Sequence, residues 1–472
     1  MIKTHPAAGP APSPPGGEPV ILDRSRHPIS RREIDPDALK VLYRLHRNGF
    51  LAYLVGGAVR DLLLRKTPHD FDLGTDARPN QIKRLFRNAF LIGRRFRLAH
   101  IHFQGGKVIE VSTFRCDPEP EPETDSAAAD DAGTGLEVAA PAASGQEGEE
   151  GTPETKAERE PGAGRRRPPA HPIAYGTPRE DAFRRDITIN ALFYDIATFS
   201  VIDYVGGLED IAARRIRTIG DPVTRYTEDP VRIWRVLRHA ARLDFGLEAE
   251  TCRAIEPCRD LLRTSSGARL YEELNKDLKS GTVRPLLEMM RTYALLPILF
   301  GEAGRAYQAS GGMFGRLGAL LDILDHSVAA GEALSATEMY SLFYWPWLEP
   351  RLATAEGDRF KALHELVESA SMAVLVPNAV RANVVQTLLV VDHMLHALET
   401  GRMRWSLRKR VHYREASRVL SLILRATPGR EPDPFERLFT QKFPGPAAAP
   451  GRLRRPRRRR GRHRPAEPRQ PV

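Results

Sequence analysis

The sequence contains little cysteine and no long apolar run. Only three cysteines, Cys116, Cys252 and Cys258, occur among 472 residues. They are too few for a disulfide framework, and their spacing does not give the close ligand pairs of a structural zinc site. No apolar stretch approaches the ~18–20 residues that cross a bilayer. We therefore expect a cytoplasmic chain with no integral membrane association.

Two segments also lack the apolar residues that a folded core requires. The chain opens with "MIKTHPAAGPAPSPPGGEP", which is rich in Pro, Gly and Ala and has no apolar core of the kind found in secretory signals. Residues 117–160 carry 14 acidic side chains against two basic ones. Such segments cannot bury enough surface to offset the entropy lost on ordering. We interpret them as a disordered leader and a disordered insertion.

Positive charge is in excess and unevenly distributed. The net charge is +11 and the isoelectric point is about 9.7. Arginine dominates residues 452–464, "RLRRPRRRRGRHR", a stretch too rich in Pro and Arg to fold alone. A strongly basic chain indicates a polyanionic partner, and we interpret this tail as a nucleic-acid tether that does not read sequence.

The periodicity of apolar residues changes along the chain. Short apolar runs and Gly-Gly turns predict an α/β domain with a small mixed sheet, and helical spacing prevails from Tyr226 to about residue 427. The expected segments are a disordered leader (1–33), an α/β head (34–220) with its acidic insertion (117–171), a neck (221–285), a helical RNA-binding body (286–430) and a basic disordered tail (431–472).

Two aspartates stand two positions apart in the stretch "PHDFDLGT". If this stretch is a strand, Asp70 and Asp72 share one face of it. Paired carboxylates suit a hard divalent cation, which takes oxygen ligands from carboxylates and from substrate phosphates. Glu110, in the strand-like "KVIEVSTF", offers a third carboxylate. The alternative is that Asp70 caps a turn and Asp72 is solvated.

A Gly-Gly pair precedes these aspartates in "VGGAVRD". Gly56 and Gly57 stand between a predicted strand and a predicted helix, where glycine lets backbone N–H groups approach a phosphate. Arg60 follows one turn later and is placed to clasp a triphosphate. An ordinary tight turn with a surface arginine would explain this motif alone. The two motifs in this order are uncommon by chance.

Three motifs in order resemble those of the class II tRNA nucleotidyltransferase and bacterial poly(A) polymerase family, within the polymerase-beta-like nucleotidyltransferases. "LVGGAVRDLLL…HDFDLGT" resembles the head motif, and "FRRDITINALFYD" is similar to the motif that follows it. "YTEDPVRIWRVLRHAARL" is similar to the nucleotide-recognition helix. The resemblance runs from about residue 29 to 243, interrupted by the acidic insertion. It implies a nucleotidyltransferase head followed by an all-α neck and body.

The resemblance implies roles for individual residues. Asp70 and Asp72 match the catalytic pair that binds metal, Asp186 matches a residue that some accounts count as catalytic, and Glu110 is our additional catalytic candidate. The positions that match or adjoin nucleotide contacts are Gly56, Gly57, Arg60, Arg185, Asp229, Arg232, Arg235 and Arg238.

Asp229 and Arg232 match the pair that reads the edge of the base. Their i, i+3 spacing puts them on one face of a helix. An acceptor carboxylate beside a rigid guanidinium can imitate a base-pairing partner. A surface ion pair would have the same spacing, but the neighbouring motifs favour base recognition.

The activity that the resemblance implies is template-independent addition of AMP from ATP to RNA 3′ ends. The substrates would be messenger RNA and other transcripts, whose turnover the added tails promote, possible partners being RNA-degradation proteins. The implied cofactor is Mg²⁺ or Mn²⁺ in a two-metal mechanism, with ATP as the substrate. Positioning and charge neutralisation would then supply most of the acceleration.

Two other functions remain open from the residues. A CCA-adding tRNA nucleotidyltransferase would share the base-reading pair. The segment "LFRNAFLIGRRFRLAHIHF" (85–103) is similar to bacterial poly(A) polymerases and favours tail synthesis. A non-catalytic RNA-binding protein on a relic head is the second alternative. The intact acidic pair argues against it, because a relic has no physical reason to keep two like charges together.

Basic and aromatic residues alternate near the end of the predicted body. The stretch "RMRWSLRKRVHYREA" (402–416) is suited to phosphate contacts and base stacking. An ordinary basic amphipathic helix is equally consistent with it. The predicted RNA-binding residues are Arg404, Trp405, Arg408, Lys409 and Arg410.

Overall fold

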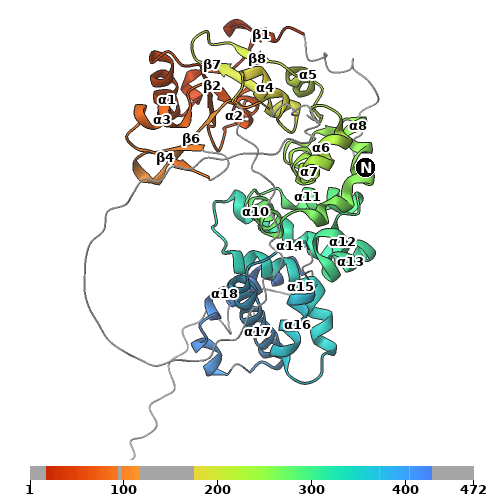
Figure 1. Cartoon of the computed structure of the whole chain (residues 1–472). Helices are drawn as coiled ribbons and strands as arrows, with labels where there is room; N and C mark the ends of the chain where they lie inside the picture. The colour runs from red at the N-terminus through yellow and green to blue at the C-terminus, as the bar shows by residue number, and fades with distance from the viewer. Residues whose placement is uncertain (1–16, 94–97, 117–174, 371–372, 403, 428–472) are drawn as a thin grey trace, which may run out of the picture. The chain divides into compact units, whose positions relative to one another are not determined.

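A computed structural model of the chain describes residues 17–93, 98–116, 175–370, 373–402 and 404–427. The chain divides into two compact units, residues 1–264 and 265–472 (Figure 1). All of the predicted acidic insertion and of the predicted tail, and residues 1–16 of the predicted leader, lie outside the described residues. Within the described part, no helix is both long enough and apolar enough to span a membrane.

Unit 1 is built on an eight-stranded sheet with the order β1-β8-β7-β2-β3-β6-β5-β4. β3 and β6 run parallel, and every other neighbouring pair is antiparallel. The mixed sheet confirms the predicted α/β head, although the sheet is larger than expected. The strands are β1 (Val20–Leu22), β2 (Ala52–Val55), β3 (Leu73–Thr75), β4 (Ala89–Ile92), β5 (Leu98–His102), β6 (Val108–Thr113), β7 (Leu192–Asp195) and β8 (Val201–Asp203).

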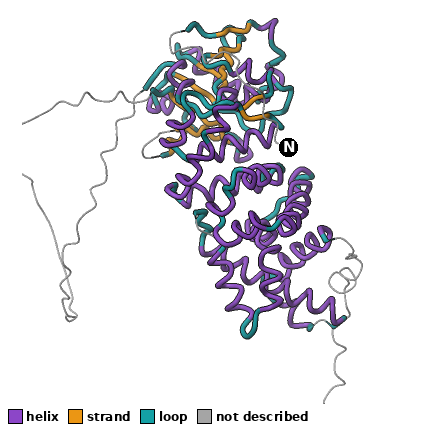
Figure 2. The backbone as a smooth tube through the Cα atoms, turned by 90° about the vertical axis from the view of Figure 1, so that its right-hand side faces the viewer, coloured by secondary structure: helices purple, strands orange, loops and turns teal. Residues whose placement is uncertain are grey.

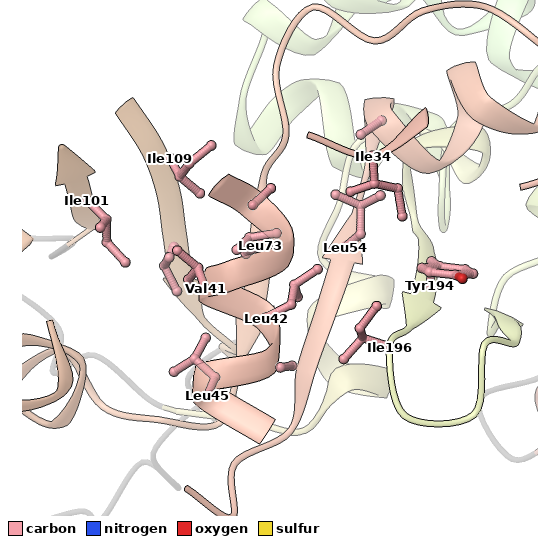
Figure 3. Packing of buried hydrophobic residues seen from close by; sticks show 14 of the residues in the cluster. Ile34, Val41, Leu42, Leu45, Leu54, Leu73, Ile101, Ile109, Tyr194 and Ile196 are labelled. Carbon is pink, nitrogen blue, oxygen red and sulfur yellow. The ribbon is translucent and has the colours of Figure 1, made fainter. Parts of the chain in front are cut away.

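Helix α1 (Pro36–Arg47) packs on one face of this sheet. Its first turn is capped by Asp35, whose Oδ1 accepts hydrogen bonds from two backbone N–H groups of that turn. Val41 and Leu42 of α1 lie among Leu54 and Leu73 of the strands (Figure 3). The other helices beside the sheet are α2 (Gly57–Leu63), α3 (Pro79–Leu85), α4 (Pro178–Phe183) and α5 (Gly207–Ala212).

A second apolar cluster covers the opposite face of the sheet. Tyr53 and Val55 of β2 and Phe193 of β7 pack there with Phe114 and with Ala182 of α4. These strand residues alternate with those that face α1, because neighbouring side chains of a strand point to opposite faces. Other side chains of these strands therefore point to the α1 face or to the α4 face according to the same alternation.

The structure corrects the predicted leader. Residues 20–22 form β1, which pairs with β8 at the edge of the sheet. His27 Nε2 contacts the Phe199 carbonyl oxygen at 2.9 Å, and Ile29 is fully buried. The Pro- and Gly-rich composition ends before this point, and the open edge of β8 supplies backbone partners for the short apolar run "VIL".

The two ends that flank the acidic insertion lie side by side. Arg115 and Tyr175 form an isolated antiparallel bridge. The Gly176 N–H donates to the Phe114 carbonyl oxygen at 3.0 Å. Backbone contacts therefore join the segment that precedes the insertion to the segment that follows it.

Helices follow the sheet in the remainder of unit 1, as expected from Tyr226 onward. A short parallel pair of strands, β9 and β10, was not predicted, since two residues are too few to show a period. The elements are β9 (Arg215–Ile216), α6 (Pro222–Glu228), α7 (Val231–Leu243), β10 (Gly246–Leu247), α8 (Ala249–Arg253), α9 (Ile255–Cys258) and the 3-10 helix η5 (Arg259–Thr264).

The described part of unit 2 consists of helices and loops (Figure 2). Its interior includes aromatic residues of α15, where Tyr340 stacks on Tyr271 and Phe343 packs against Phe300. The elements are α10 (Gly267–Leu278), α11 (Val283–Thr292), α12 (Leu296–Leu299), α13 (Gly301–Ala309), α14 (Gly311–Ala329), α15 (Ala336–Thr354), α16 (Arg359–Ser369), α17 (Asn378–Thr400), the 3-10 helix η6 (Trp405–Lys409) and α18 (Tyr413–Ala426).

Candidate active site

The aspartate pair lies immediately before β3 rather than inside a strand. Asp70 and Asp72 are in irregular backbone, and β3 begins at Leu73. The Asp72 carbonyl oxygen accepts a hydrogen bond from the Val55 N–H at 3.0 Å, so the β2 ladder reaches this residue and then stops. The prediction of one strand over both residues is wrong because β2 ends at Val55 and the chain turns away at Gly56.

Strand register brings Glu110 beside the pair. In the parallel β3–β6 ladder Leu73 lies opposite Val111, so the residues that precede them, Asp72 and Glu110, are neighbours. Both alternate with residues of the α1 core and therefore point to the α4 face of the sheet. Glu110 is also held by His100 on β5, whose Nε2 lies 3.4 Å from Oε1.

The environment of Asp72 disfavours its negative charge. Its side chain remains accessible to solvent, yet surrounding protein partly desolvates the carboxylate. That burial, followed by the charges of Glu110 and Asp70, raises the pKa of Asp72 to about 6, against a smaller lowering by Arg185. This is an excess of negative charge that a cation would relieve.

These residues fit a divalent cation whose remaining ligands come from elsewhere. Within the described ranges, no group of three or more His, Cys, Asp or Glu side chains is arranged to hold a metal ion. Mg²⁺ commonly takes only one or two carboxylates, with water and substrate phosphates completing its shell. Asp70 and Asp72 could therefore hold such an ion, whereas the predicted catalytic role of Glu110 stays a prediction.

The Gly-Gly turn has the backbone that only glycine adopts easily. Gly56 has φ +73° and ψ −133°, and a Cβ there would lie 3.1 Å from Arg185 Nη1. The Gly56 N–H donates to the Leu192 carbonyl oxygen at 3.1 Å, so it is already used within the fold. Gly57 opens α2 beside it. The predicted phosphate contacts of both glycines stay predictions.

Arg60 is buried rather than displayed at the surface. Only 2% of it is exposed, and its guanidinium is paired with Asp61 at 2.8 Å. Its Nη1 donates to Oδ1 of Asn190. Arg60 thus has a full set of protein partners in this structure, an arrangement that suits a positioning residue better than the predicted direct clasp on a triphosphate.

Asn190 links Arg60 to the helix α7, a connection that the sequence analysis missed. Because Oδ1 of Asn190 accepts from Arg60, its Nδ2 donates to His239 Nε2, at 3.1 Å. Nδ1 of the same ring lies 3.5 Å from Arg60 Nη1, so both ring nitrogens face donor groups. Burial, and after it the positive charge of Arg60, hold the pKa of His239 well below its usual value.

Arg185 lies over the Gly-Gly turn and is fixed by an acidic partner. Its Nη2 pairs with Asp181 Oδ2 at 3.0 Å, and its Nη1 donates to the Asn190 carbonyl oxygen at 3.0 Å. Arg225 in turn donates to the carbonyl oxygens of Arg184, at 2.7 Å, and of Arg185, at 3.1 Å. Asp181 and Arg225 therefore hold the predicted "RRD" motif in place.

Asp186 is buried and paired with a predicted nucleotide contact on α7. Arg235 Nε lies 3.1 Å from its Oδ2, and the Ile187 N–H donates to its Oδ1. Burial alone would raise the pKa of Asp186, but the charges of Arg235 and Arg232 and the backbone hydrogen bond from Ile187 hold it below its usual value. Asp186 is therefore an ionised carboxylate at neutral pH.

Asp229 caps α7 instead of lying within it. It precedes the N-cap residue Pro230, and its Oδ1 accepts from the Val231 N–H at 3.2 Å. The prediction of a shared helical face is therefore wrong, since the proline forces the helix to begin after Asp229. Arg232 still lies within the field of Asp229, and its Nη1 donates to the Arg185 carbonyl oxygen at 3.3 Å.

The remaining nucleotide candidate, Arg238, is half-buried on α7, and its charge contributes to the lowered pKa of His239. The structure thus gathers the candidates from the Gly-Gly turn, the "RRD" motif and α7 within unit 1. The predicted RNA-binding residues lie in unit 2, around η6. There, Arg404, Lys409 and Arg410 are exposed and Arg408 is half-buried, while the Trp405 side chain lies outside the described part.

The chain matches two known families. The family described as "Poly A polymerase head domain" matches residues 52–217. The family described as "Probable RNA and SrmB- binding site of polymerase A" matches residues 244–305. The predicted RNA-binding body (286–430) overlaps this second range from residue 286 to 305, whereas the individual RNA-binding residues predicted from the sequence lie beyond it, at 404–410.

The similar proteins include both kinds of enzyme that the sequence left open. Poly(A) polymerase I of Salmonella typhimurium is 35% identical over 85% of this chain and 81% of its own length. Poly(A) polymerase I of Haemophilus influenzae is 34% identical over 75% of this chain and 72% of its own length. The CCA-adding enzyme of Bacillus pumilus is 35% identical, over 51% of this chain and 49% of its own length.

Solved structures show the same fold at low identity. The CCA-adding enzyme of Bacillus stearothermophilus in complex with CTP is 21% identical, with a TM-score of 0.54 over 86% of this chain and 82% of that chain. The Thermotoga maritima CCA-adding enzyme complexed with tRNA is 18% identical, with a TM-score of 0.55 over 89% and 85%. The chain therefore belongs to the class II tRNA nucleotidyltransferase and bacterial poly(A) polymerase family, and it is a nucleotidyltransferase.

Proposed function

We propose that this chain is a polynucleotide adenylyltransferase that adds AMP from ATP to RNA 3′ ends without a template. The observation that carries the chemistry is the acidic pair Asp70 and Asp72 beside Glu110, with Arg185 close enough to affect the charge of Asp72. The extent of similarity favours tail synthesis, since the poly(A) polymerase I relatives match 75–85% of the chain and the CCA-adding relatives match 51–61%.

Each step of the reaction can be assigned to residues of unit 1. Enzymes of this kind use a divalent metal, which when bound activates the attacking 3′-hydroxyl and neutralises triphosphate charge. Asp70 and Asp72 would hold it. The 3′-oxygen would attack the α-phosphorus of ATP and lose its proton to solvent, and pyrophosphate would leave with the α–β bridging oxygen as the bond from that oxygen to the α-phosphorus breaks. Arg185, fixed by Asp181, supplies positive charge to the triphosphate.

Base and sugar recognition would use the motif residues around α7. Asp229 presents an acceptor and Arg232 a donor, which together can contact the edge of adenine. Asp186, ionised and held by Arg235, is suited to accept from a ribose hydroxyl. We propose that the RNA substrates are messenger RNA and other cytoplasmic transcripts. The added tails would promote the turnover of these RNAs, with RNA-degradation proteins as partners.

Replacement of the acidic pair tests whether the head is catalytic. In Asp70→Ala with Asp72→Ala, AMP incorporation into a short RNA should fall to background while RNA binding is retained. Incorporation at the wild-type level would support a non-catalytic RNA-binding protein instead. The matched control is Asp76→Ala, an exposed aspartate four residues away whose Oδ1 accepts from the Leu51 N–H; it should retain activity.

CCA addition is the second candidate function, and the CCA-adding relative and solved structures favour it. The two activities differ in the product rather than in the acidic pair. A tRNA that lacks its 3′ terminus, incubated with CTP and ATP together, distinguishes them. Addition that stops after CCA on this tRNA, with no extension of unrelated RNA, would replace the poly(A) proposal.

A further inference from the structure

A cavity of about 980 Å³ lies in unit 2 between α17 and the turn that contains η6. His393 and His396 of α17 line one side of it. Arg402, Arg404 and Arg410, which flank η6 in the sequence, line the other. Thr400 and Ser406 also border it, and among the described residues that line it none is acidic.

The described part of the protein does not neutralise the three arginines of this cavity. All are exposed, and within the described residues none forms an ion pair or a side-chain hydrogen bond. His396, which also lines the cavity, lies 4.0 Å from Glu399. Some other exposed cations of unit 2 have acidic partners, as with Arg316 and Glu349. Among the described residues, the cavity is therefore a local excess of positive charge.

The backbone of the turn fixes the arginines on either side of a buried residue. Leu407 is 6% exposed and anchors η6 in the apolar interior of unit 2. Its N–H donates to the Arg404 carbonyl oxygen at 3.0 Å, and its own carbonyl oxygen accepts from the Arg410 N–H at 3.2 Å. The positions of Arg404 and Arg410 beside the cavity are thus set before any ligand binds, which lowers the entropy cost of binding.

We propose that this cavity binds consecutive backbone phosphates of single-stranded RNA, away from the 3′ end that reacts in unit 1. Guanidinium groups bind phosphate through paired N–H donors, and three of them around one cavity suit several phosphates rather than one. The inference rests on the proposed function, because it takes RNA as the substrate. It adds Arg402, His393 and His396 to the residues that the sequence indicated.

Salt dependence of RNA binding tests the site in the full-length chain. Each phosphate contact on a single strand contributes about 0.7 to the slope of log K against log salt. For Arg402→Gln with Arg410→Gln, the slope for an oligo(A) RNA should therefore be smaller by about 1.4. The matched control is Lys361→Gln with Arg316→Gln, exposed cations paired with Glu365 and Glu349; it should keep the wild-type slope.

The result is independent of whether AMP is transferred, because binding is measured without ATP. An unchanged slope in the double variant would overturn the inference even if the wild-type chain makes poly(A). If the wild-type chain makes no poly(A), the proposed function is instead overturned. Inorganic phosphate, added at constant ionic strength, tests for a free-phosphate site. If phosphate binds the wild type but not the double variant while both bind RNA with the same salt slope, the cavity takes the small ion only and the proposal is wrong.

Discussion

At Asp72, three causes act in one direction on a single carboxylate. Partial burial, Glu110 and Asp70 all raise its pKa, and the opposing effect of Arg185 is smaller. A residue held in this state costs stability at neutral pH, which is characteristic of functional sites. The sequence indicated the carboxylate pair but not this shift, which depends on the β3–β6 register.

Metal dependence should therefore vary with pH. Because the pKa of Asp72 is about 6, a proton competes with the cation below that pH. The Mg²⁺ concentration for half-maximal AMP transfer should be about tenfold higher at pH 5 than at pH 8. The measurement is a Mg²⁺ titration at several pH values with saturating RNA and ATP. A half-saturating concentration that stays constant across this range would contradict the assignment.

Removal of the negative charge of Asp72 should stabilise the metal-free protein. The folded pKa of Asp72, about 6, lies above the usual value near 4, so above pH 6 the side chain is ionised in both states and its charge destabilises the folded state relative to the unfolded one. Asp72→Asn should therefore raise the melting temperature at pH 8 and change it little at pH 4. Thermal unfolding in EDTA measures this. A lower melting temperature at pH 8 would contradict it.

Asn190 is expected to matter through the groups that it joins. Asn190→Ala leaves Arg60 and His239 without this partner, so the unfolding free energy should fall by about 1–3 kcal/mol and the KM for ATP should rise. Asn48→Ala, which removes an exposed hydrogen bond to Arg44, is the matched control and should change stability by less than about 0.5 kcal/mol. Equal effects of the two variants would argue against the linking role.

At the scale of elements, the sequence predicted the positions of β2 and α2, on either side of the Gly-Gly turn, and of β6, around Glu110, because each shows apolar periodicity or a glycine turn. It placed Asp70 and Asp72 in a strand because alternation continues beyond the point where the β2 partner ends. Asn190 and His239 could not be found in this way. Their contact joins residues 49 positions apart, and neither belongs to a periodic pattern.

Asp229, at the start of α7, has two roles that substitutions can separate: capping the helix and contacting the base. Asp229→Asn keeps an acceptor for the Val231 N–H, so stability should change by less than about 0.5 kcal/mol. It removes the charge that would contact the base, so kcat/KM for ATP should fall by roughly 10–100-fold. Asp229→Ala should lose both functions. Melting temperatures and kinetics with ATP and CTP measure this, and a destabilised Asp229→Asn with normal selectivity would contradict base recognition.

At the scale of the whole molecule, the stability and activity of the head should not depend on its acidic insertion. Arg115 and Tyr175 form a bridge on either side of it, so replacement of residues 118–172 by a short Gly-Ser linker leaves the same ends to be joined. The melting temperature and AMP transfer should stay near wild-type values. Loss of activity with an unchanged melting temperature would show that the segment acts in the reaction.

The division into an α/β head and a helical body followed from composition and periodicity. The predicted leader was too long, since β1 forms only because β8 offers an open edge. The family range at residues 244–305 was likewise outside the reach of motif reasoning. Residues 94–97 of the segment that favoured tail synthesis lie outside the described part, so the choice of product depends on direct measurement.

The most direct test of the central claim is the product formed from each nucleotide alone. The purified full-length chain is incubated with a short unstructured RNA, Mg²⁺ and ATP, CTP, GTP or UTP in separate reactions, and the products are sized on a denaturing gel. The proposed function predicts long ladders with ATP alone and little extension with the others. Equal extension with CTP, or no extension of this RNA with any nucleotide, would contradict it.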